Sequence, residues 1–219
     1  ALNRPATEQL TAHELVASLA EAEIASKAHK RTELLIRTSR LRYHAVLDQI
    51  HYGSERGLSK DLLVELADTG FVTRSENILI TGSTGTGKSF VGCALGRQAC
   101  LMGYRTLYYS MNRFMEALAV ARLQGTYLKW LNQIAKTPVL IIDDFGLATL
   151  NTDIKLTFLQ ILEDRFAKGT TIITSQLPVD KWFDYIDEPT VADATLDRLT
   201  ANAHRIELKG KSKRKEKTT

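Results

Sequence analysis

The chain has 219 residues and a hydrophobic content of 44%, which fits one globular α/β core with a small appendage rather than a disordered protein. No apolar run approaches the length of a membrane span and no secretory signal is visible, so we expect a cytoplasmic protein. The net charge is only +4, but segments 27–44 and 209–219 each carry +5, which leaves an acidic body and indicates a polyanionic partner.

Residues 1–75 are predicted to form a small helical region that binds DNA or a partner protein. Thr11 and Glu14 fit a capping box at the start of a helix, and Leu10 and Leu15 fit the hydrophobic staple around it. Basic residues follow on the same predicted helix, where a solvated helix face is the simpler alternative. Four of them are candidate DNA contacts: Lys30, Arg31, Arg37 and Arg40.

The first predicted strand, at 77–81, leads into the most informative octapeptide of the chain. Residues 82–89 read GSTGTGKS, a full match to the phosphate-binding pattern G-x-x-x-x-G-K-[S/T], and a helix is predicted after it. Glycines in such a loop let successive backbone N–H groups face the phosphates of a nucleotide. Lys88 is expected to reach the β and γ phosphates, and the Ser89 hydroxyl to bind Mg²⁺. The predicted nucleotide-binding residues are Gly82, Ser83, Thr84, Gly85, Thr86, Gly87, Lys88, Ser89 and Phe90.

From residue 77 on, predicted strands and helices alternate, which is the pattern of a parallel α/β sheet. The predicted strands are 77–81, 105–109, 139–142, 170–174 and 205–208. The predicted helices are 90–102, 111–122, 127–135, 153–166 and 191–199. Five strands with right-handed helical crossovers make a three-layer core, which we place at 76–208, ahead of a basic tail at 209–219. We expect Tyr108 and Tyr109, in the second strand, to be packing residues.

Two carboxylates follow the third predicted strand. Residues 139–142 form a continuous apolar run, and Asp143 and Asp144 stand at its carboxyl end, where open α/β sheets place their ligands. A solvated loop start is the simpler alternative for such a pair. Because the glycine loop is also present, we expect ATP and Mg²⁺ as cofactors. No N-K-x-D motif occurs that would indicate guanine instead.

Four longer strings point to a known family. They are LIIDDFGLATL (140–150), LQILEDRF (159–166), TIITSQLPVDKW (171–182) and DATLDRLTANAHRIELKGKS (193–212). With these strings and its glycine loop, the chain resembles the IstB/DnaC-like AAA+ ATPases, and among them the IstB transposition helpers of insertion sequences. The resemblance implies a P-loop nucleoside triphosphatase of the AAA+ type with a five-stranded parallel sheet.

The resemblance also implies roles at the two carboxylates. Asp143 would hold Mg²⁺ together with Ser89, Lys88 would neutralise the phosphates, and Asp144 would orient the attacking water. Many AAA+ proteins have a glutamate where Asp144 stands. Aspartate is one methylene shorter, so we expect slow turnover that DNA or assembly stimulates.

Two further catalytic residues follow from the resemblance. Gln176 lies in the segment that matches sensor I, where a polar group contacts the γ-phosphate or the water. Arg198 matches the arginine finger that acts on a neighbouring subunit, although the residues alone favour a surface salt bridge with Asp193 or Asp197. Only 21 residues of this sequence follow Arg198, so we expect it to lack the usual C-terminal helical lid.

The implied function is that of an ATP-dependent transposition helper. It would form homo-oligomers, bind and remodel duplex DNA, and recruit or stimulate a transposase. Further candidate DNA contacts follow the second strand: Arg113, Arg122 and Lys129. Two alternatives stay open: a replicative-helicase loader of the DnaC type, and a DNA-binding scaffold that uses ATP only to hold its subunits together.

Overall fold

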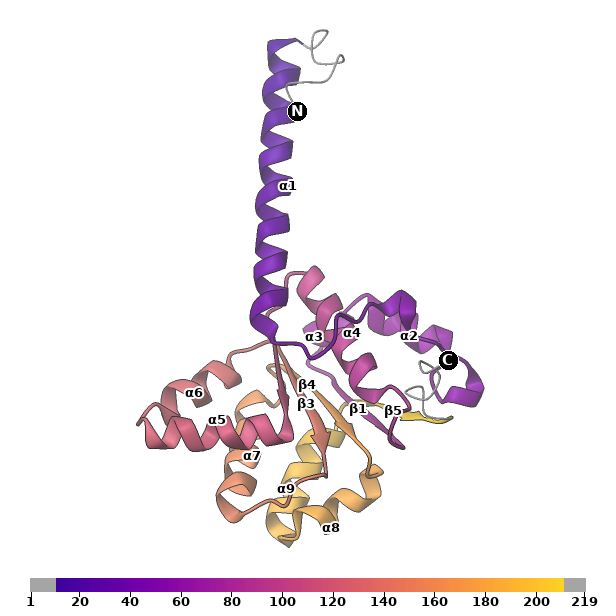
Figure 1. The fold of residues 1–219 in the computed structure, drawn as a ribbon, viewed down its shortest axis with the longest axis vertical. Coiled ribbons are helices and arrows are strands. Elements are labelled where there is room, and N and C mark those ends of the chain that lie inside the picture. Colours follow the sequence, from indigo (N-terminus) through magenta and orange to yellow (C-terminus); the bar gives the residue numbers. More distant parts are fainter. Residues whose placement is uncertain (1–10, 211–219) are drawn as a thin grey trace, which may run out of the picture.

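The computed structural model describes residues 11–210, which form a five-stranded sheet with helices on both faces and one long projecting helix (Figure 1). The helices are α1 (Ala12–Ser39), α2 (Lys60–Ala67), α3 (Gly70–Thr73), α4 (Lys88–Leu101), α5 (Met111–Leu123), α6 (Tyr127–Ala135), α7 (Thr152–Arg165), α8 (Trp182–Ile186) and α9 (Pro189–Thr200), with 3-10 turns η2 (Leu47–Gln49), η3 (Ser54–Arg56) and η4 (Val179–Lys181). The strands are β1 (Asn77–Gly82), β2 (Thr106–Ser110), β3 (Val139–Phe145), β4 (Thr170–Ser175) and β5 (Ala203–Leu208). The predicted strands and helices of the core are confirmed, with ends displaced by three residues at most.

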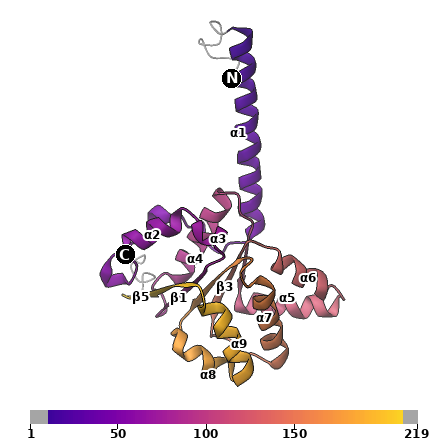
Figure 2. The ribbon, with the colours of Figure 1, turned by 180° about the vertical axis from the view of Figure 1, so that it is seen from behind.

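The sheet has the strand order β2-β3-β4-β1-β5, and every neighbouring pair is parallel. Parallel neighbours need crossover connections, and the helices that supply them cover both faces. Helices α2, α3 and α4 lie on the face that carries Ile78 and Ile80, and α5 to α9 lie on the face that carries Leu79 (Figure 2). The predicted three-layer fold is therefore confirmed. All carboxyl ends of the strands share one edge, where ligands bind in such sheets.

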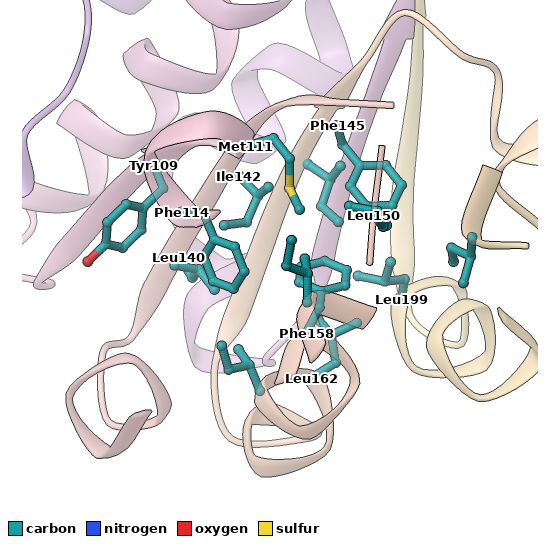
Figure 3. Packing of buried hydrophobic residues seen from close by; sticks show 14 of the residues in the cluster. Tyr109, Met111, Phe114, Leu140, Ile142, Phe145, Leu150, Phe158, Leu162 and Leu199 are labelled. Carbon is teal, nitrogen blue, oxygen red and sulfur yellow. The ribbon is translucent and has the colours of Figure 1, made fainter. Parts of the chain in front are cut away.

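Aromatic rings fill the core between the sheet and helices α5 to α9 (Figure 3). Phe114 contacts Tyr109 and Phe158 edge-on, with ring centroids 6.1 Å apart in both pairs. Phe145 lies 5.0 Å from Trp182 by the same measure. Rings in this geometry add stabilisation beyond the area they bury. This aromatic layer therefore stabilises the part of the sheet that leads to the carboxyl ends of the strands.

A β-bulge in β3 positions the two carboxylates. The register with β4 shifts between Ile142 and Phe145, so β3 has one residue more than its partner there. The extra residue turns Phe145 into the aromatic core, whereas strict alternation would have directed it towards α4. Asp144 takes a left-handed conformation at this bulge, with φ of 61°. Asp143 faces α4 by the regular alternation that also places Val139 and Ile141 on that side, while the bulge turns Asp144 to the edge of the sheet.

Arg165 fixes the opposite, amino edge of the sheet from inside. Its guanidinium is buried and donates to the carbonyl oxygen of Ile134, at 2.8 Å, in the last turn of α6. It also donates to the carbonyl oxygens of Thr137 and Thr170, which joins the end of α6 to the start of β4. Burial lowers the pKa of Arg165 to about 10, so the group stays charged at neutral pH.

Helix α1 stands apart from the body (Figure 1). The predicted capping box is confirmed: the Thr11 side chain accepts from the Glu14 N–H, and the Glu14 carboxylate accepts from the Thr11 N–H at 2.8 Å. Leu10, of the predicted staple, lies outside the described residues. With 28 residues at ~1.5 Å each, α1 is about 42 Å long, and its last turns contact α4 and β2. Between residues 11 and 210, no helix is both long and apolar enough to cross a membrane.

The chain after α1 packs into the core on the α4 side. Ala45, Ile50, Leu58 and Phe71 are buried there against β1 and α4. The division into segments 1–75, 76–208 and 209–219 was made by the function expected of each segment, and it remains a prediction. Most of the basic tail lies beyond residue 210 and outside the described residues.

Candidate functional site

The predicted phosphate-binding loop lies between β1 and α4. Gly82, Gly85 and Gly87 have φ angles of 142°, 85° and 97°, which glycine adopts far more easily than other residues. At Gly82 a Cβ atom would stand 2.2 Å from the Leu208 carbonyl oxygen, so the close approach of β5 also requires glycine. Helix α4 begins at Lys88, directly after this loop, so its N-terminus points at the space that the loop encloses.

The loop meets β3 through Ser89 and Asp143. The Ser89 hydroxyl donates to Asp143 Oδ1 at 2.8 Å, although the two residues are 54 positions apart in the chain. Lys88 is buried, and its ammonium group donates to the carbonyl oxygens of Gly82 and Ser83 at 2.7 and 2.9 Å. The structure thus brings together the lysine, the hydroxyl and the carboxylate that the sequence singled out.

Asp143 is fully buried, and hydroxyl groups satisfy its carboxylate. Tyr108 donates to Oδ2 at 2.6 Å, and Thr174 donates to Oδ1. Tyr108 was expected only to pack, but it also orients this carboxylate from β2. Burial, followed by the Asp143 charge, raises the pKa of Tyr108, so its hydroxyl remains a proton donor. The alternation of β2 could have revealed this role, since it turns Tyr108 to the same face as Asp143.

Asp144 is more exposed and has a cationic partner. Its backbone N–H donates to the Thr174 hydroxyl at 3.3 Å, and its Oδ2 accepts from Arg42 Nη1 at 3.2 Å. The same Arg42 nitrogen lies 3.6 Å from Asp143 Oδ2. Burial, and then the Asp143 charge, raises the pKa of Asp144, while Arg42 offsets part of the increase. Arg42 belongs to the basic segment of the sequence, but nothing there pairs it with a carboxylate 102 residues away.

The predicted sensor segment also meets the loop. The Gln176 side-chain oxygen accepts from the Thr84 hydroxyl at 2.7 Å. Thr174, two residues earlier in β4, contacts both Asp143 and Asp144. The carboxyl ends of β1, β3 and β4 therefore present their polar side chains to one space.

A cavity of about 530 Å³ opens beside the loop. Its far wall comes from the N-terminal region, and sequence reasoning did not identify these residues: Tyr43, Gln49, Ile50, His51 and Arg56. Tyr43 lies 6.5 Å from the ring of Phe90, measured between centroids, so two aromatic rings border one side. The predicted residues Thr84, Gly85, Gly87, Lys88, Ser89 and Phe90 line the near wall. The cavity offers an apolar end and a cationic end, as a nucleotide requires.

Arg56 supports the phosphate-binding loop and has a hydrogen-bond donor that a bound nucleotide could use. Its Nη2 donates to the Thr86 carbonyl oxygen at 2.8 Å. Its Nε is buried and has no hydrogen-bond partner within the described part of the chain. A buried donor beside a cavity calls for an acceptor. A nucleoside triphosphate with Mg²⁺ suits this site. It offers acceptors to the unpartnered Arg56 donor and to Lys88, and its metal ion would take the oxygen ligands Ser89 and Asp143.

Arg198 lies at the other end of the sheet. Its carbonyl oxygen accepts from Asn77 Nδ2 at 3.0 Å, and Asn77 begins the strand that ends at Gly82. Five steps of ~3.3 Å separate these two strand ends by about 17 Å. The Arg198 guanidinium pairs with Glu163 at 3.1 Å and with Asp197 at 3.7 Å. The expected salt bridge with Asp197 is therefore present, and the structure does not bring Arg198 to its own loop.

The candidate DNA contacts fall into two groups. Lys30, Arg31, Arg37 and Arg40 are exposed on or just after α1. Beyond β2, two arginines are already in ion pairs: Arg113 with Glu116 at 2.7 Å, and Arg122 with Asp153 at 3.0 Å from its Nε. Lys129 is exposed on α6. Of all these residues, only Arg40 and Arg113 border the same groove.

A family model described as IstB-like ATP binding protein matches residues 2–219. The chain belongs to this family. An insertion sequence ATP-binding protein of Sinorhizobium fredii is 41% identical over 209 residues, which cover 95% of this chain and 85% of that one. The corresponding protein of insertion sequence IS21 from Pseudomonas aeruginosa is 29% identical over 213 residues, covering 97% and 80% of the two chains. The resemblance seen in the sequence is confirmed.

Solved structures show the same fold in this IstB-like chain. The DnaC helicase loader has a TM-score of 0.62 at 19% identity, and the match covers 76% of this chain and 98% of the loader. The replication initiator DnaA, bound to AMPPCP and single-stranded DNA, has a TM-score of 0.64 at 22% identity, covering 78% and 52%. The AAA+ fold and the family together make the IstB-like chain an ATP-binding protein and an ATPase, as predicted.

Proposed function

We propose that this chain is an ATP-dependent, DNA-binding helper of transposition whose ATP sites lie between neighbouring subunits. Each site would consist of the loop, Asp143, Asp144 and Gln176 of one copy and Arg198 of the next. The assembly would bind duplex DNA, remodel it and recruit or stimulate a transposase. The relatives named after insertion sequences support the association with transposition.

The position of Arg198 carries this proposal. The residue lies about 17 Å from its own phosphate loop, at the opposite end of β1, and is held there by Asn77. An arginine needs direct contact to stabilise the charge of a phosphoryl group during transfer. Within one chain Arg198 cannot reach the phosphates, so it would serve a second copy. Its pairs with the half-exposed Glu163 and the exposed Asp197 are the kind that a phosphate can replace.

The residues at the carboxyl edge suit the remaining steps. Lys88 would leave the loop carbonyl oxygens for the β and γ phosphates, which offer it full negative charge. Ser89 and Asp143 would hold Mg²⁺, which would neutralise the phosphate oxygens when bound. Asp144 would orient the water, and Gln176 would contact the γ-phosphate or that water. Because Asp144 is short for this task, we expect slow turnover.

The N-terminal wall of the cavity would take the adenine base. Tyr43 and Phe90 present aromatic rings and Ile50 an apolar surface, and purines stack well on such groups. Arg56 would offer its unpaired Nε–H to a ribose or phosphate oxygen. ATP binding would thereby connect the region before β1 with the loop after it.

Duplex DNA is the polyanion that the charge distribution favours. Helix α1 projects from the body (Figure 1), and Lys30, Arg31 and Arg37 are exposed on it. Contacts to phosphates give affinity with little sequence preference, as a helper at varied target sites would need. A helicase-loader role has less support, because the likeness to DnaC is at 19% identity and carries only the fold.

The test measures ATP hydrolysis and assembly mass together. Purified protein with ATP and Mg²⁺ should hydrolyse slowly, faster at higher protein concentration and faster again with duplex DNA. The assembly mass should increase with ATP and DNA. A monomer that hydrolyses at full rate, at any dilution and without DNA, would contradict the proposal. Pull-downs against the transposase and the replicative helicase of the same cell would separate the two candidate partners.

A further inference from the structure

Arg42 is a charged group at the site that the proposed reaction does not use. It follows α1 after Arg40, whose left-handed conformation (φ 58°) ends the helix, and Leu41. Its Nη1 lies 3.2 Å from Asp144 Oδ2, the carboxylate proposed to orient the water. While this pair persists, the carboxylate is partly neutralised, and one of its oxygens is occupied on the side of the bulge. The contact therefore restrains the group on which hydrolysis depends.

Arg42 also borders a groove that leads away from the nucleotide cavity. A hollow of about 420 Å³ lies between Arg40, Arg42, Arg113 and Asp144. A second hollow, of about 470 Å³, adjoins it along α5 and shares Arg40 and Arg113. Because the two hollows share lining residues, we treat them as one groove at the base of α1, lined by three arginines and by Glu116, the ion-pair partner of Arg113. Asp144 belongs both to this groove and to the nucleotide cavity.

An elongated polyanion suits this groove better than a single small anion. Arg37 and Lys30 are exposed on α1 and extend the positive charge outward from Arg40, although Glu33 lies between them on the same helix face. A DNA backbone presents phosphates at regular short intervals and can follow such a line, whereas a free phosphate would use one end only. Arginine forms paired hydrogen bonds with phosphate as readily as with carboxylate, so phosphate and Asp144 compete for Arg42.

We propose that Arg42 is a DNA-released latch on Asp144. With the groove empty, Arg42 holds the carboxylate; when duplex DNA enters, a backbone phosphate takes Arg42 and leaves Asp144 free to orient water. The inference rests on the proposed function, because it supplies the link by which DNA would stimulate hydrolysis. It makes the coupling reciprocal: whatever frees Arg42 from Asp144 must also strengthen DNA binding.

DNA binding without nucleotide gives the first test, since it does not depend on catalysis. The affinity for a labelled duplex is measured over a salt series for the wild type, Asp144→Asn, Arg42→Gln and the double variant. Asp144→Asn should tighten binding about two- to fivefold, the size of a partly exposed ion pair. Arg42→Gln should weaken binding and reduce the salt slope by about 0.9, the value of one lost phosphate contact. In the Arg42→Gln background, Asp144→Asn should have no further effect.

Two results of this comparison of single and double variants would overturn the proposal that Arg42 is a latch. One is an unchanged affinity in Asp144→Asn. The other is equal tightening with and without Arg42, which a general loss of negative charge would give. Arg42→Lys serves as a second variant that keeps the charge and loses the paired geometry, and it should fall between the wild type and Arg42→Gln. Arg205→Gln is the matched control, since Arg205 is exposed on β5 at the opposite side edge of the sheet.

Hydrolysis gives the second test and separates the latch from the proposed function. Arg42→Gln should raise the rate without DNA about two- to fivefold and should abolish stimulation by DNA. A lower rate without DNA would mean that Arg42 assists the chemistry, and the latch would be wrong. If the wild type binds and responds to DNA but Arg42→Gln responds equally, only the latch fails. If the wild type neither binds duplex DNA nor responds to it, the proposed function and the latch both fail.

Discussion

The carboxyl edge and the amino edge of the sheet hold their charged groups in different ways. At the carboxyl edge, Lys88, Ser89, Asp143 and Asp144 are hydrogen-bonded or ion-paired, Lys88 to loop carbonyl oxygens and the carboxylates to hydroxyls and Arg42. At the amino edge, Arg198 is partly exposed, donates to the Ala194 carbonyl oxygen at 3.1 Å and pairs with the partly exposed carboxylates of Glu163 and Asp197. One edge is a nearly complete phosphate site, and the other carries the cation that we propose for the site of a second copy.

This difference shows why one copy would be insufficient. Strand β1 connects the two edges rigidly, with Asn77 bonded to the Arg198 end and Gly82 in the loop. No movement of a side chain can bring Arg198 to its own loop across about 17 Å of strand. On the proposed mechanism, the two halves of the site would therefore meet only between chains, as in a head-to-tail assembly.

Substitution of Arg198 should have the largest effect. Arg198→Ala should reduce hydrolysis about 10³-fold or more, the range found for arginine fingers, because the transferred charge loses its stabilising cation. ATP affinity should be unchanged, since the loop is intact. Hydrolysis is measured by phosphate release, and ATP binding by calorimetry. Arg205→Ala is the control, and equal losses in both variants would show that the effect is not specific to Arg198.

Substitution of Arg56, which supports the phosphate-binding loop, should have a smaller effect, which falls on ATP affinity. Arg56→Ala removes the hydrogen bond to the Thr86 carbonyl oxygen and the unpaired Nε–H of the cavity. ATP affinity should fall about tenfold, as expected for one hydrogen bond to a charged group. The same calorimetric titration checks it. Unchanged affinity would mean that Arg56 supports the loop only when no nucleotide is bound. The N-terminal region would then contribute nothing to ATP binding through this residue.

The smallest effect concerns stability at Asp144. The pKa of Asp144 is raised in the folded protein, so the unfolded chain ionises this carboxyl more easily and the charge opposes folding at neutral pH. Asp144→Asn should therefore raise Tm by about 2 °C at pH 7, the shift that roughly 0.5–1 kcal/mol gives in a domain of this size. The gain should shrink as pH falls and the carboxyl of the wild type becomes protonated. Thermal unfolding between pH 7 and 4 measures it, and a gain that grows towards acid would contradict the assignment.

The sequence predicted the carboxyl edge well because its signals are local. The GSTGTGKS loop, the apolar run before Asp143 and the alternation of strands and helices each lie within short segments. The capping box at Thr11 was equally local and was confirmed. Local apolar patterns also predicted strands and helices to within three residues, and the continuous apolar runs of β1 and β3 are the clearest of them.

The contacts that sequence reasoning missed join distant segments. Arg42 pairs with a residue 102 positions away, and Arg56 supports a loop 30 positions away. The bulge in β3 depends on how Phe145 fits among Trp182 and Phe158, which no local pattern encodes. The wall formed by Tyr43 and Ile50 likewise exists only because the chain before β1 folds back over α4.

Mixing two inactive variants tests the divided site most directly. Lys88→Ala keeps a working Arg198, and Arg198→Ala keeps a working loop, so a mixed assembly contains some interfaces with both intact. With random mixing in equal amounts, about a quarter of the interfaces should be complete, and hydrolysis should recover to roughly that fraction of the wild-type rate. If the mixture remains as inactive as each variant alone, while both variants still assemble, the ATP site is not shared between chains.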